Sequence, residues 1–232
     1  MKVVIMRIEL TKRPSSPTII VGFPGVGLVG PIVTEFLIDH MKTEVMGKFV
    51  YDELPATAAV HKGALVHPMS LHYSEKHNAL IAYTVLNVRK EEWAVAGVLA
   101  QLAKDLGAKE IICIDGANAA SEESIIYAFG NPQFTQLGAQ QMQESVIMGV
   151  SAALMLIHPN TSCLFATTHS EFPDSKAAAE IVKFLDKYMG LEVDYHPLVE
   201  QATQFEQKLK SMMGQSQKML SEQDKKSMDY FG

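Results

Sequence analysis

The residues best suited to do chemistry are three glycines near the start of the sequence, Gly25, Gly27 and Gly30. Their spacing is G-x-G-x-x-G, they follow a β-branched run, and they open a stretch with helical periodicity. In dinucleotide-binding folds such glycines let the backbone approach a pyrophosphate at a helix N-terminus, where free N–H groups favour an anion. Asp52 follows at about the 20-residue distance of a ribose-binding acid. An anion-binding loop and a plain tight turn between strand and helix both remain open.

Four histidines lie close together along the chain: His61, His67, His72 and His77. Histidine pairs that bind one metal ion are usually four residues apart on a helix or two apart on a strand, and these separations match neither. We therefore expect structural or surface histidines and no metal site.

Nucleophilic catalysis finds little support in the sequence. There is no G-x-S-x-G motif, and Cys113 and Cys163 lie within apolar runs, where a thiol is buried and unreactive. Polar residues follow two expected strands, at residues 115–118 and 167–171, and could face one crevice, because ligands of open α/β sheets gather at the carboxyl ends of strands. No catalytic residue and no cofactor are predicted.

The composition excludes several classes of protein. The chain has 232 residues, of which 47% are hydrophobic and 20% charged, which is typical of a globular protein and unlike a disordered one. Its net charge of −6 and the lack of a basic cluster argue against nucleic-acid binding. The longest nearly apolar stretch, residues 146–157, is well short of the ~20 residues of a membrane-spanning helix. With two unpaired, buried cysteines expected, we predict a cytoplasmic protein that does not bind membranes.

Strands and helices are predicted to alternate along most of the chain. The clearest unit is an apolar strand at residues 78–86, an amphipathic helix at 91–106 that Gly107 ends, and a strand at 111–114. This is a βαβ unit, which requires parallel strands joined by a right-handed crossover. We therefore expect an α/β fold with a mostly parallel central sheet flanked by helices.

The other predicted elements follow from the same periodicities. Asp174 is expected to cap the helix that begins after it. The strands are predicted at residues 3–9, 18–23, 45–51, 65–72, 162–168 and 191–195, the helices at 29–41, 145–157 and 175–188, and a hairpin at 124–129 with its turn at 130–132.

The composition changes after residue 196. From Pro197 the chain is rich in Gln, Lys, Glu and Met, and its apolar residues form a narrow stripe with helical spacing. Such a stripe is typical of an arm that packs on a neighbour or forms a coiled coil. We therefore divide the chain into an α/β core domain, residues 1–196, and a C-terminal helical arm and tail, residues 197–232.

Several segments together resemble the proteasome assembly chaperone family of archaea and of their eukaryotic and actinobacterial relatives. The Gly-Phe-Pro-Gly-Val-Gly-Leu-Val-Gly segment is the most specific of them, and the others match mainly by their order and spacing. The matching segments are residues 22–30, 54–56, 60–63, the helix that carries Trp93, and residues 106–109, 111–116, 172–179, 190–194 and 197–198.

The resemblance implies a fold like that of the nucleoside phosphorylases, no established enzymatic activity, and a homo-oligomer or a hetero-oligomer with a paralogue. It also implies binding to proteasome α subunits or α rings, partly through a C-terminal hydrophobic–Tyr–any tripeptide. Tyr230, Phe231 and Gly232 take these three positions here, with Phe in place of Tyr. The loss of the hydroxyl leaves its partner unmatched, at a cost of about 1–3 kcal/mol.

We therefore expect a non-enzymatic, archaeal-type proteasome assembly chaperone or proteasome-binding protein. Two alternatives stay open from the residues alone. The first is a nucleotide- or phosphate-binding enzyme that uses Gly25, Gly27 and Gly30, and the second is a structural oligomer whose arm mediates self-association.

Overall fold

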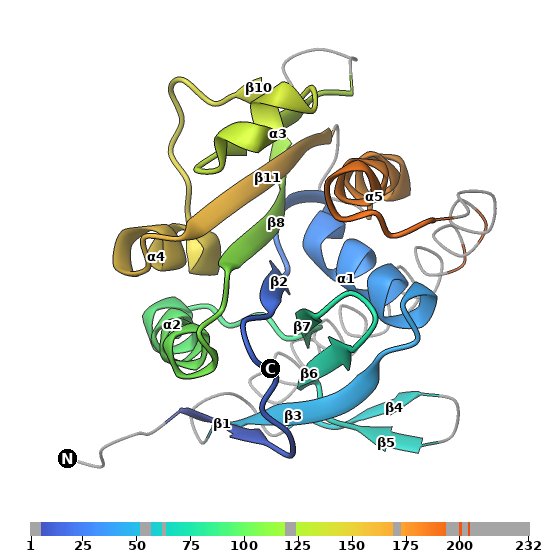
Figure 1. The fold of residues 1–232 in the computed structure, drawn as a ribbon, viewed down its shortest axis with the longest axis vertical. Helices are drawn as coiled ribbons and strands as arrows, with labels where there is room; N and C mark the ends of the chain where they lie inside the picture. Colours follow the sequence, from blue (N-terminus) through green and yellow to red (C-terminus); the bar gives the residue numbers. More distant parts are fainter. Residues whose placement is uncertain are drawn as a thin grey trace, which may run out of the picture.

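The protein is built on one nine-stranded sheet, seen in a computed structural model (Figure 1). The structure describes residues 6–51, 57–61, 64–118, 124–168, 173–193, 200 and 204. In spatial order the strands are β1 (Arg7–Leu10), β3 (Glu44–Val50), β6 (Met69–Ser74), β7 (Ala79–Thr84), β2 (Thr18–Gly22), β8 (Glu110–Asn118), β11 (Thr161–Thr168), β9 (Ile126–Phe129) and β10 (Gln140–Gln141). Two further strands, β4 (Ala59–His61) and β5 (Ala64–Val66), pair with each other.

The sheet is mixed, so the expectation of a mostly parallel sheet is only partly correct: parallel pairs form its centre and the edge pair β9–β10. The pairs β7–β2, β2–β8 and β8–β11 are parallel, whereas β1–β3, β3–β6, β6–β7 and β11–β9 are antiparallel. The antiparallel pairing of β6 with β7 has a physical cause. A four-residue turn, residues 75–78, joins β6 to β7, and a connection this short permits only antiparallel pairing.

Helices cover both faces of the sheet. On one face α1 (Val29–His40) and α5 (Ser175–Met189) pack over the central strands, and on the other lie α2 (Glu92–Leu106) and α4 (Gly149–Ile157) (Figure 1). Successive residues of β2 point to opposite faces, so Ile19 belongs to the core under α2 and Ile20 to the core under α1. This double cover explains why the central strands are continuous apolar runs.

Two helices confirm the sequence prediction closely. α2 ends at Gly107, which has the left-handed conformation (φ 59°) of a C-terminal cap. α5 begins after Asp174, whose carboxylate accepts a hydrogen bond of 3.0 Å from the backbone N–H of Ala177. Each helix therefore begins or ends at the capping residue that the sequence predicted, Asp174 for α5 and Gly107 for α2.

Other predictions are corrected. The predicted hairpin at residues 124–129 is wrong: after β9 the chain forms the five-residue helix α3 (Pro132–Gln136), and β10 then pairs with β9 in parallel. The predicted strand at 65–72 is two strands, β5 and β6, and α4 begins at Gly149 rather than at residue 145. Residues 191–193, the described part of the last predicted strand, are not a strand.

The predicted C-terminal arm, residues 197–232, lies outside the described residues except for positions 200 and 204, both of which are helical. The division between core domain and arm therefore stays a prediction. No helix within the described ranges is long and apolar enough to cross a membrane.

Candidate functional site

The glycine segment forms the connection between β2 and α1. Strand β2 ends at Gly22, a short 3₁₀ turn, η1 (Val26–Leu28), follows, and α1 begins at Val29. Gly27 has φ 64°, a left-handed conformation that glycine adopts without a steric penalty, and the N–H of Leu28 donates to the carbonyl of Gly25 over 3.1 Å. The chain therefore turns sharply from strand to helix here, as the sequence predicted.

The loop rests directly on the carboxyl ends of β8 and β11. A Cβ atom placed on Gly25 would lie 2.1 Å from Oδ1 of Asp115, and one on Gly27 would lie 2.8 Å from Oγ1 of Thr168. The strand residue Gly116 approaches the loop equally closely, since a Cβ on it would lie 2.1 Å from the carbonyl oxygen of Val26. A side chain at Gly116 would collide with backbone, one at Gly27 would also be strained by its positive φ, and one at Gly25 would displace the Asp115 carboxylate.

The start of α1 approaches the sheet just as closely. A Cβ on Gly22 would lie 2.4 Å from the carbonyl oxygen of Gly30, and one on Gly30 would lie 2.8 Å from the carbonyl oxygen of Ile114. Close approach to backbone atoms therefore accounts for Gly22 and Gly30, and close approach to the Asp115 and Thr168 side chains accounts for Gly25 and Gly27. An anion-binding role for Gly25, Gly27 and Gly30 stays a prediction that the packing does not require.

Asp115 is a buried ionisable group of this region. Burial raises the pKa of its carboxyl to about 6, against the opposing effect of the Gly116 N–H, which donates to Oδ1 over 2.8 Å. At neutral pH the carboxyl is thus mostly ionised and lies beside Gly25. A negative charge at this position opposes the approach of a phosphate to the glycine loop.

The structure brings together the two polar strand ends that the sequence singled out. Strands β8 and β11 are parallel neighbours, with Gly116 paired to Ala166 and Asn118 to Thr168. The residue before α5 contacts the glycine loop beside these strand ends, because the N–H of Asp174 donates to the carbonyl of Gly27 over 2.9 Å. Thr167 accepts a hydrogen bond of 2.8 Å from the N–H of Ile125. Residues 169–171 lie outside the described residues.

The two cysteines lie side by side inside the sheet. Cys113 on β8 is paired in register with Cys163 on β11, and both are fully buried free thiols. The contact with Cys163 and burial both raise the pKa of the Cys113 thiol well above its usual value, which keeps it protonated. This is the unreactive environment that the apolar runs predicted.

Of the four histidines, His72 has the best-defined surroundings. Its Nε2 lies 2.9 Å from the hydroxyl of Ser70, its ring meets the ring of Tyr83 edge to face, and burial lowers its pKa to about 4. This histidine is therefore neutral and structural at physiological pH. Within the part of the chain that the structure describes, no group of three or more His, Cys, Asp or Glu residues could hold a metal ion.

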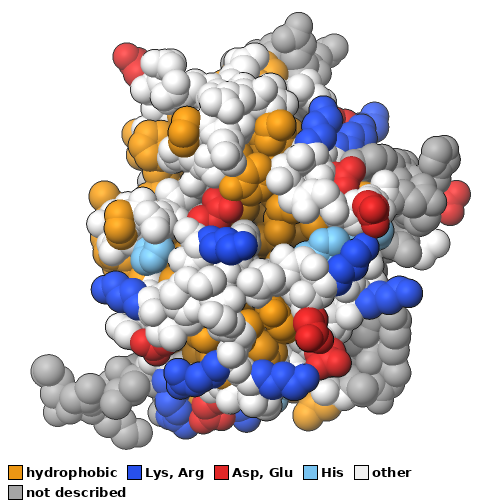
Figure 2. Space-filling model, in the orientation of Figure 1, with side chains coloured by type: hydrophobic (Ala, Val, Ile, Leu, Met, Phe, Trp, Pro, Cys, Tyr) orange, Lys and Arg blue, Asp and Glu red, His pale blue; other side chains and the backbone are white. Residues whose placement is uncertain are grey.

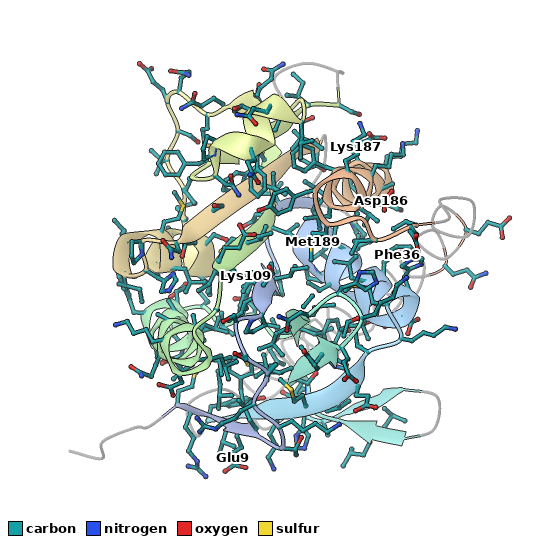
Figure 3. The ribbon with its side chains drawn as sticks, viewed as in Figure 1. Glu9, Phe36, Lys109, Asp186, Lys187 and Met189 are labelled. Carbon is teal, nitrogen blue, oxygen red and sulfur yellow. The ribbon has the colours of Figure 1, made fainter. Side chains whose placement is uncertain are left out.

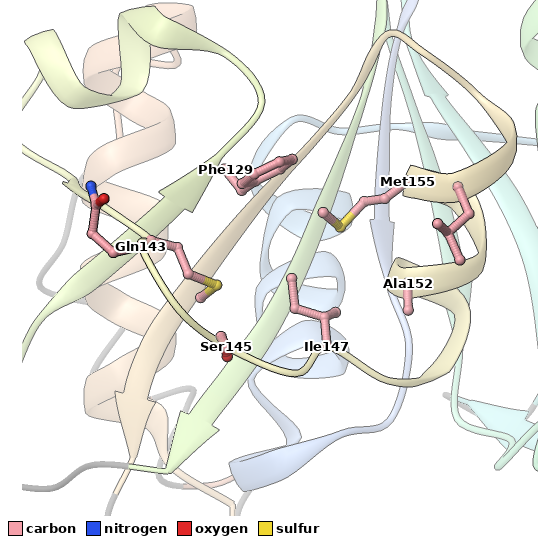
Figure 4. A pocket seen from close by; sticks show the side chains of 8 residues that line it. Phe129, Gln143, Ser145, Ile147, Ala152 and Met155 are labelled. Atoms are coloured by element: carbon pink, nitrogen blue, oxygen red, sulfur yellow. The ribbon is translucent and has the colours of Figure 1, made fainter.

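The structure reveals an apolar surface that the sequence reasoning did not assign to a function. A cavity of about 280 Å³ lies between α4, β9 and the loop that precedes α4 (Figure 4). The side chains of Phe129, Ile147 and Met155 point into it. The signal in the sequence was the uncharged run at residues 145–157, from which we predicted a helix but no binding surface.

The predicted partner-binding residues Tyr230, Phe231 and Gly232 lie outside the described residues. Their role stays a prediction that rests on the sequence.

Comparison with protein families gives one match across most of the chain. The model described as the PAC2 family matches residues 19–213. Among curated proteins, an uncharacterized protein of Methanocaldococcus jannaschii is 24% identical over 218 residues, which cover 90% of this chain and 91% of that protein.

Solved structures share the fold over nearly their whole length. Pyrococcus furiosus PbaA, described as an archaeal homolog of proteasome-assembly chaperone, has a TM-score of 0.82 at 23% identity, covering 90% of this chain and 97% of that chain. Pyrococcus furiosus PbaB, described as an archaeal proteasome activator, has a TM-score of 0.72 at 21% identity, covering 90% and 98%. A protein of unknown function from Thermoplasma acidophilum has a TM-score of 0.80 at 18% identity, covering 91% of each chain.

Proposed function

Because the chain belongs to the PAC2 family, as its glycine segment and the motifs after it indicated, we propose that it is a non-enzymatic proteasome-binding protein that assists proteasome assembly. In this proposal it is a cytoplasmic, archaeal-type member of the family that binds proteasome α subunits or α rings. It acts as a homo-oligomer or together with a paralogue.

The observation that carries the proposal is the match to PbaA, which extends over 90% of this chain and 97% of that chain. The two folds therefore match over nearly the whole of each chain. PbaB, described as a proteasome activator, has the same fold over a similar share of the chain. Two structural relatives whose descriptions concern the proteasome favour a partner of that kind for this chain too.

The packing of the glycine loop supports a scaffold rather than an active site. In a phosphate-binding loop the glycines leave room for the ligand. Here the space above Gly25 and Gly27 is taken by the side chains of Asp115 and Thr168. The loop thus stabilises the junction of β2, β8, β11 and α1, and the surface of the molecule is left for binding proteins.

We further propose that Tyr230, Phe231 and Gly232 dock between neighbouring α subunits. The aromatic ring of Phe231 would fill an apolar slot, and a terminal carboxylate would pair with a lysine of the ring. Phe in place of Tyr retains the ring and loses one hydroxyl, so this contact is weaker than that of a tyrosine by about tenfold or more.

The test uses the full chain and assembled α rings of the same organism. Native electrophoresis should show the chain migrating with the rings, and a binding titration should yield its dissociation constant. Removing residues 230–232 should raise that constant at least tenfold, because the ring contact is lost. Ser227→Ala is the matched control in the same segment and should leave binding unchanged.

The possible results separate the two parts of the proposal. If the intact chain neither migrates with α rings nor captures free α subunits, the proteasome-related function is wrong. If the intact chain binds and the shortened chain binds equally well, only the tail docking is wrong, and another surface makes the contact.

A further inference from the structure

Strand β6 has two different faces. Its apolar side chains Met69 and Leu71 belong to the core under α2. Because the side chains of a strand alternate between the faces of a sheet, Ser70 and His72 point to the other side, where α1 and α5 lie. We call this side of β6 and its neighbours the β6 surface. It consists of Ser70 and His72 of β6, Tyr83 of β7, and the half-buried Lys48 and Val50 of β3.

No described helix packs over the β6 surface. Helix α1 lies over β2, β7 and β8, and the hydrophobic cluster beneath α1 and α5 contains no residue of β3 or β6. Only side chains from the edge of α1 reach this surface: the charges of Glu35 and Asp39 act on Tyr83, and the charge of Asp39 also acts on His72. The rest of the β6 surface has no cover within the described residues.

The β6 surface is nevertheless shielded from water. Ser70 is 5% exposed, and burial lowers the pKa of His72 to about 4, although the charge of Asp39 acts in the opposite direction. Burial also raises the pKa of Tyr83. The hydroxyl of Ser70 and Nε2 of His72 satisfy each other over 2.9 Å, as buried polar groups do. A part of the protein beyond α1 therefore covers these side chains.

The outer edge of the same side of the sheet is different. On β1, Arg7 and Glu9 are exposed and form an ion pair of 2.9 Å, and Glu9 lies at the edge of the sheet (Figure 3). Figure 2 shows charged side chains of both signs gathered where β1 and β3 lie. Val45 on β3 is 64% exposed. The edge strands are thus solvated, as one face of an antiparallel sheet often is, and the cover is confined to the β6 surface.

The chain that follows α5 starts beside the β6 surface. Leu191 and Val193 are buried in the cluster under α1 and α5. The carbonyl of Leu191 lies 3.3 Å from Nε2 of His40, the last residue of α1. Glu192 forms an ion pair of 3.1 Å with Lys76, which lies in the turn that leaves β6. These contacts fix residue 193 near the end of β6, where the remaining chain begins.

Only one stretch outside the described residues is long enough to form a covering helix. The other stretches have at most five residues each: residues 1–5, 52–56, 62–63, 119–123 and 169–172. The arm, by contrast, continues to residue 232. A helix of about 14 residues is about 21 Å long, which spans several strands that are about 4.8 Å apart. The arm can therefore extend from the end of β6 across the whole β6 surface.

The first half of the arm has the pattern of a helix that is covered on one side. Glu200 and Gln204 are helical and exposed. Phe205, Leu209 and Met212 follow at the spacing i, i+4, i+7, which places them together on a different side of the same helix. The PAC2 model matches up to residue 213, and a glycine, which is a poor helix former, comes next. Residues 200–213 therefore belong to the same family unit as the core.

The charges of this segment and of the β6 surface are complementary. Glu35 and Asp39 are four residues apart on α1, so they lie along one edge of that helix, beside the β6 surface. Lys208 comes three residues after Phe205, so on a helix it borders the apolar side. A narrow apolar side with a lysine at its border suits a surface that has few apolar groups and two carboxylates beside it.

We propose that residues 200–213 form a helix that packs on the β6 surface of the same chain, beside α1. Phe205, Leu209 and Met212 face the β6 surface, and Lys208 lies toward Glu35 and Asp39. The core domain then ends at about residue 213 rather than at residue 196, and residues 214–232 are left to bind a partner. This inference does not depend on the proposed proteasome function, since it concerns the isolated chain.

Leu209→Glu and Leu220→Glu form a matched pair that tests the cover. Both introduce the same charge at a leucine of the arm, one before Gly214 and one after it. Diethyl pyrocarbonate modifies accessible imidazoles, and mass spectrometry of the full chain measures the rate at His72 relative to the exposed His67. Leu209→Glu should raise this relative rate by about tenfold or more, because the cover opens locally, and Leu220→Glu should leave it unchanged.

The two buried cysteines show whether a variant is folded. Cys113 and Cys163 react with a thiol reagent only when the core opens. If Leu209→Glu makes them reactive, Leu209→Ala takes its place and should raise the relative rate at His72 by about threefold with the thiols still protected. An unchanged rate at His72 in the folded Leu209 variant, or an equal rise in Leu220→Glu, overturns the proposal.

Cross-linking tests whether the helix covers its own chain. A carbodiimide joins a lysine to a carboxylate in direct contact, so Lys208 should become linked to Glu35 or Asp39. In a mixture of ¹⁴N- and ¹⁵N-labelled chains, each linked pair of peptides should carry one isotope only. Pairs of mixed isotope would show that the segment covers a second copy, and a Lys208 linked to neither carboxylate would show that it lies elsewhere. Either result overturns the proposal.

Both measurements use the chain without any proteasome component, so the failure of this proposal and the failure of the proteasome function are separate results.

Discussion

Gly30 and Gly97 show how differently two helical glycines can be constrained. A Cβ at Gly30 would lie within 3 Å of three backbone atoms, in Ile114, Gly22 and Phe23, whereas a Cβ at Gly97 on α2 would meet nothing within 4 Å. We expect Gly30→Ala to lower the free energy of unfolding by about 1–3 kcal/mol through overpacking. Gly97→Ala should raise it by about 0.5–1 kcal/mol, because alanine stabilises a helix interior.

Urea unfolding of both variants measures these changes. Equal stabilities for Gly30→Ala and the wild type would show that α1 does not approach the sheet as closely as the structure has it.

The glycine loop also yields a binding prediction. Because the Asp115 and Thr168 side chains occupy the space next to Gly25 and Gly27, pyrophosphate or a dinucleotide should not stabilise the protein. A ligand present at a hundredfold excess over its dissociation constant would add about 2.7 kcal/mol, which a thermal-shift measurement detects easily. A clear stabilisation at about 1 mM pyrophosphate would instead favour the anion-binding alternative.

Asp115 makes stability depend on pH. Burial raises the pKa of its carboxyl from 3.8 to about 6, so between these values the folded state holds the proton that the unfolded state has released. The folded state therefore loses stability as the pH rises from about 4 to about 6, and the full penalty is present above that range. Asp115→Asn removes the ionisation and should stabilise the protein by about 3 kcal/mol at neutral pH.

Denaturant unfolding at several pH values tests this account. The difference between Asp115→Asn and the wild type should shrink toward zero near pH 4, where the wild-type carboxyl is protonated too. A difference that does not change with pH would exclude ionisation as its cause.

At the level of the element, α5 depends on its first residue. The Asp174 carboxylate accepts the Ala177 N–H over 3.0 Å, which satisfies one of the free donors of the first turn. Asp174→Ala should cost about 1 kcal/mol of unfolding free energy, while Asp174→Asn should cost much less, since an amide oxygen caps nearly as well. Urea unfolding distinguishes the two, and equal losses would contradict a capping role.

The elements that were predicted well are those whose signals are local. α2 and α5 have an apolar face at helical spacing and a glycine or aspartate at one end, and both formed within a residue or two of the predicted bounds. The segment after β9 was predicted wrongly because its elements are too short to have a period. The two-residue strand β10 exists only because it pairs with β9, a contact that no local pattern encodes.

At the level of the whole molecule, the layers predict an order of local stability. β2, β8 and β11 are covered on both faces, whereas β4 and β5, among the described residues, pair only with each other. Backbone amides of Ile112 and Leu164 should therefore exchange with solvent only on global unfolding, and those of the β4–β5 pair many orders of magnitude faster. Hydrogen exchange followed by mass spectrometry measures both, and similar rates in the two regions would contradict this layering.

The sequence by itself determined the class of fold, the double cover of the central strands and the family. These depend on periodicity, on apolar runs and on the order of short motifs, all of which are properties of neighbouring residues. The uncharged run before and within α4 was visible too, but not the side of the sheet on which it lies.

Only the tertiary structure decided the strand order, the reason for the glycines and the exposure of the apolar residues around α4. Gly25, Gly27 and Gly30 look alike in a phosphate-binding loop and in a close-packed turn, and only the positions of Asp115 and Thr168, far along the chain, distinguish the two. Contacts between residues distant in sequence also decide that Asp115 is buried and that Leu156 is not. Burial is a property of the packed molecule, and it decides which groups titrate, which glycines are required and which surface is left for a partner.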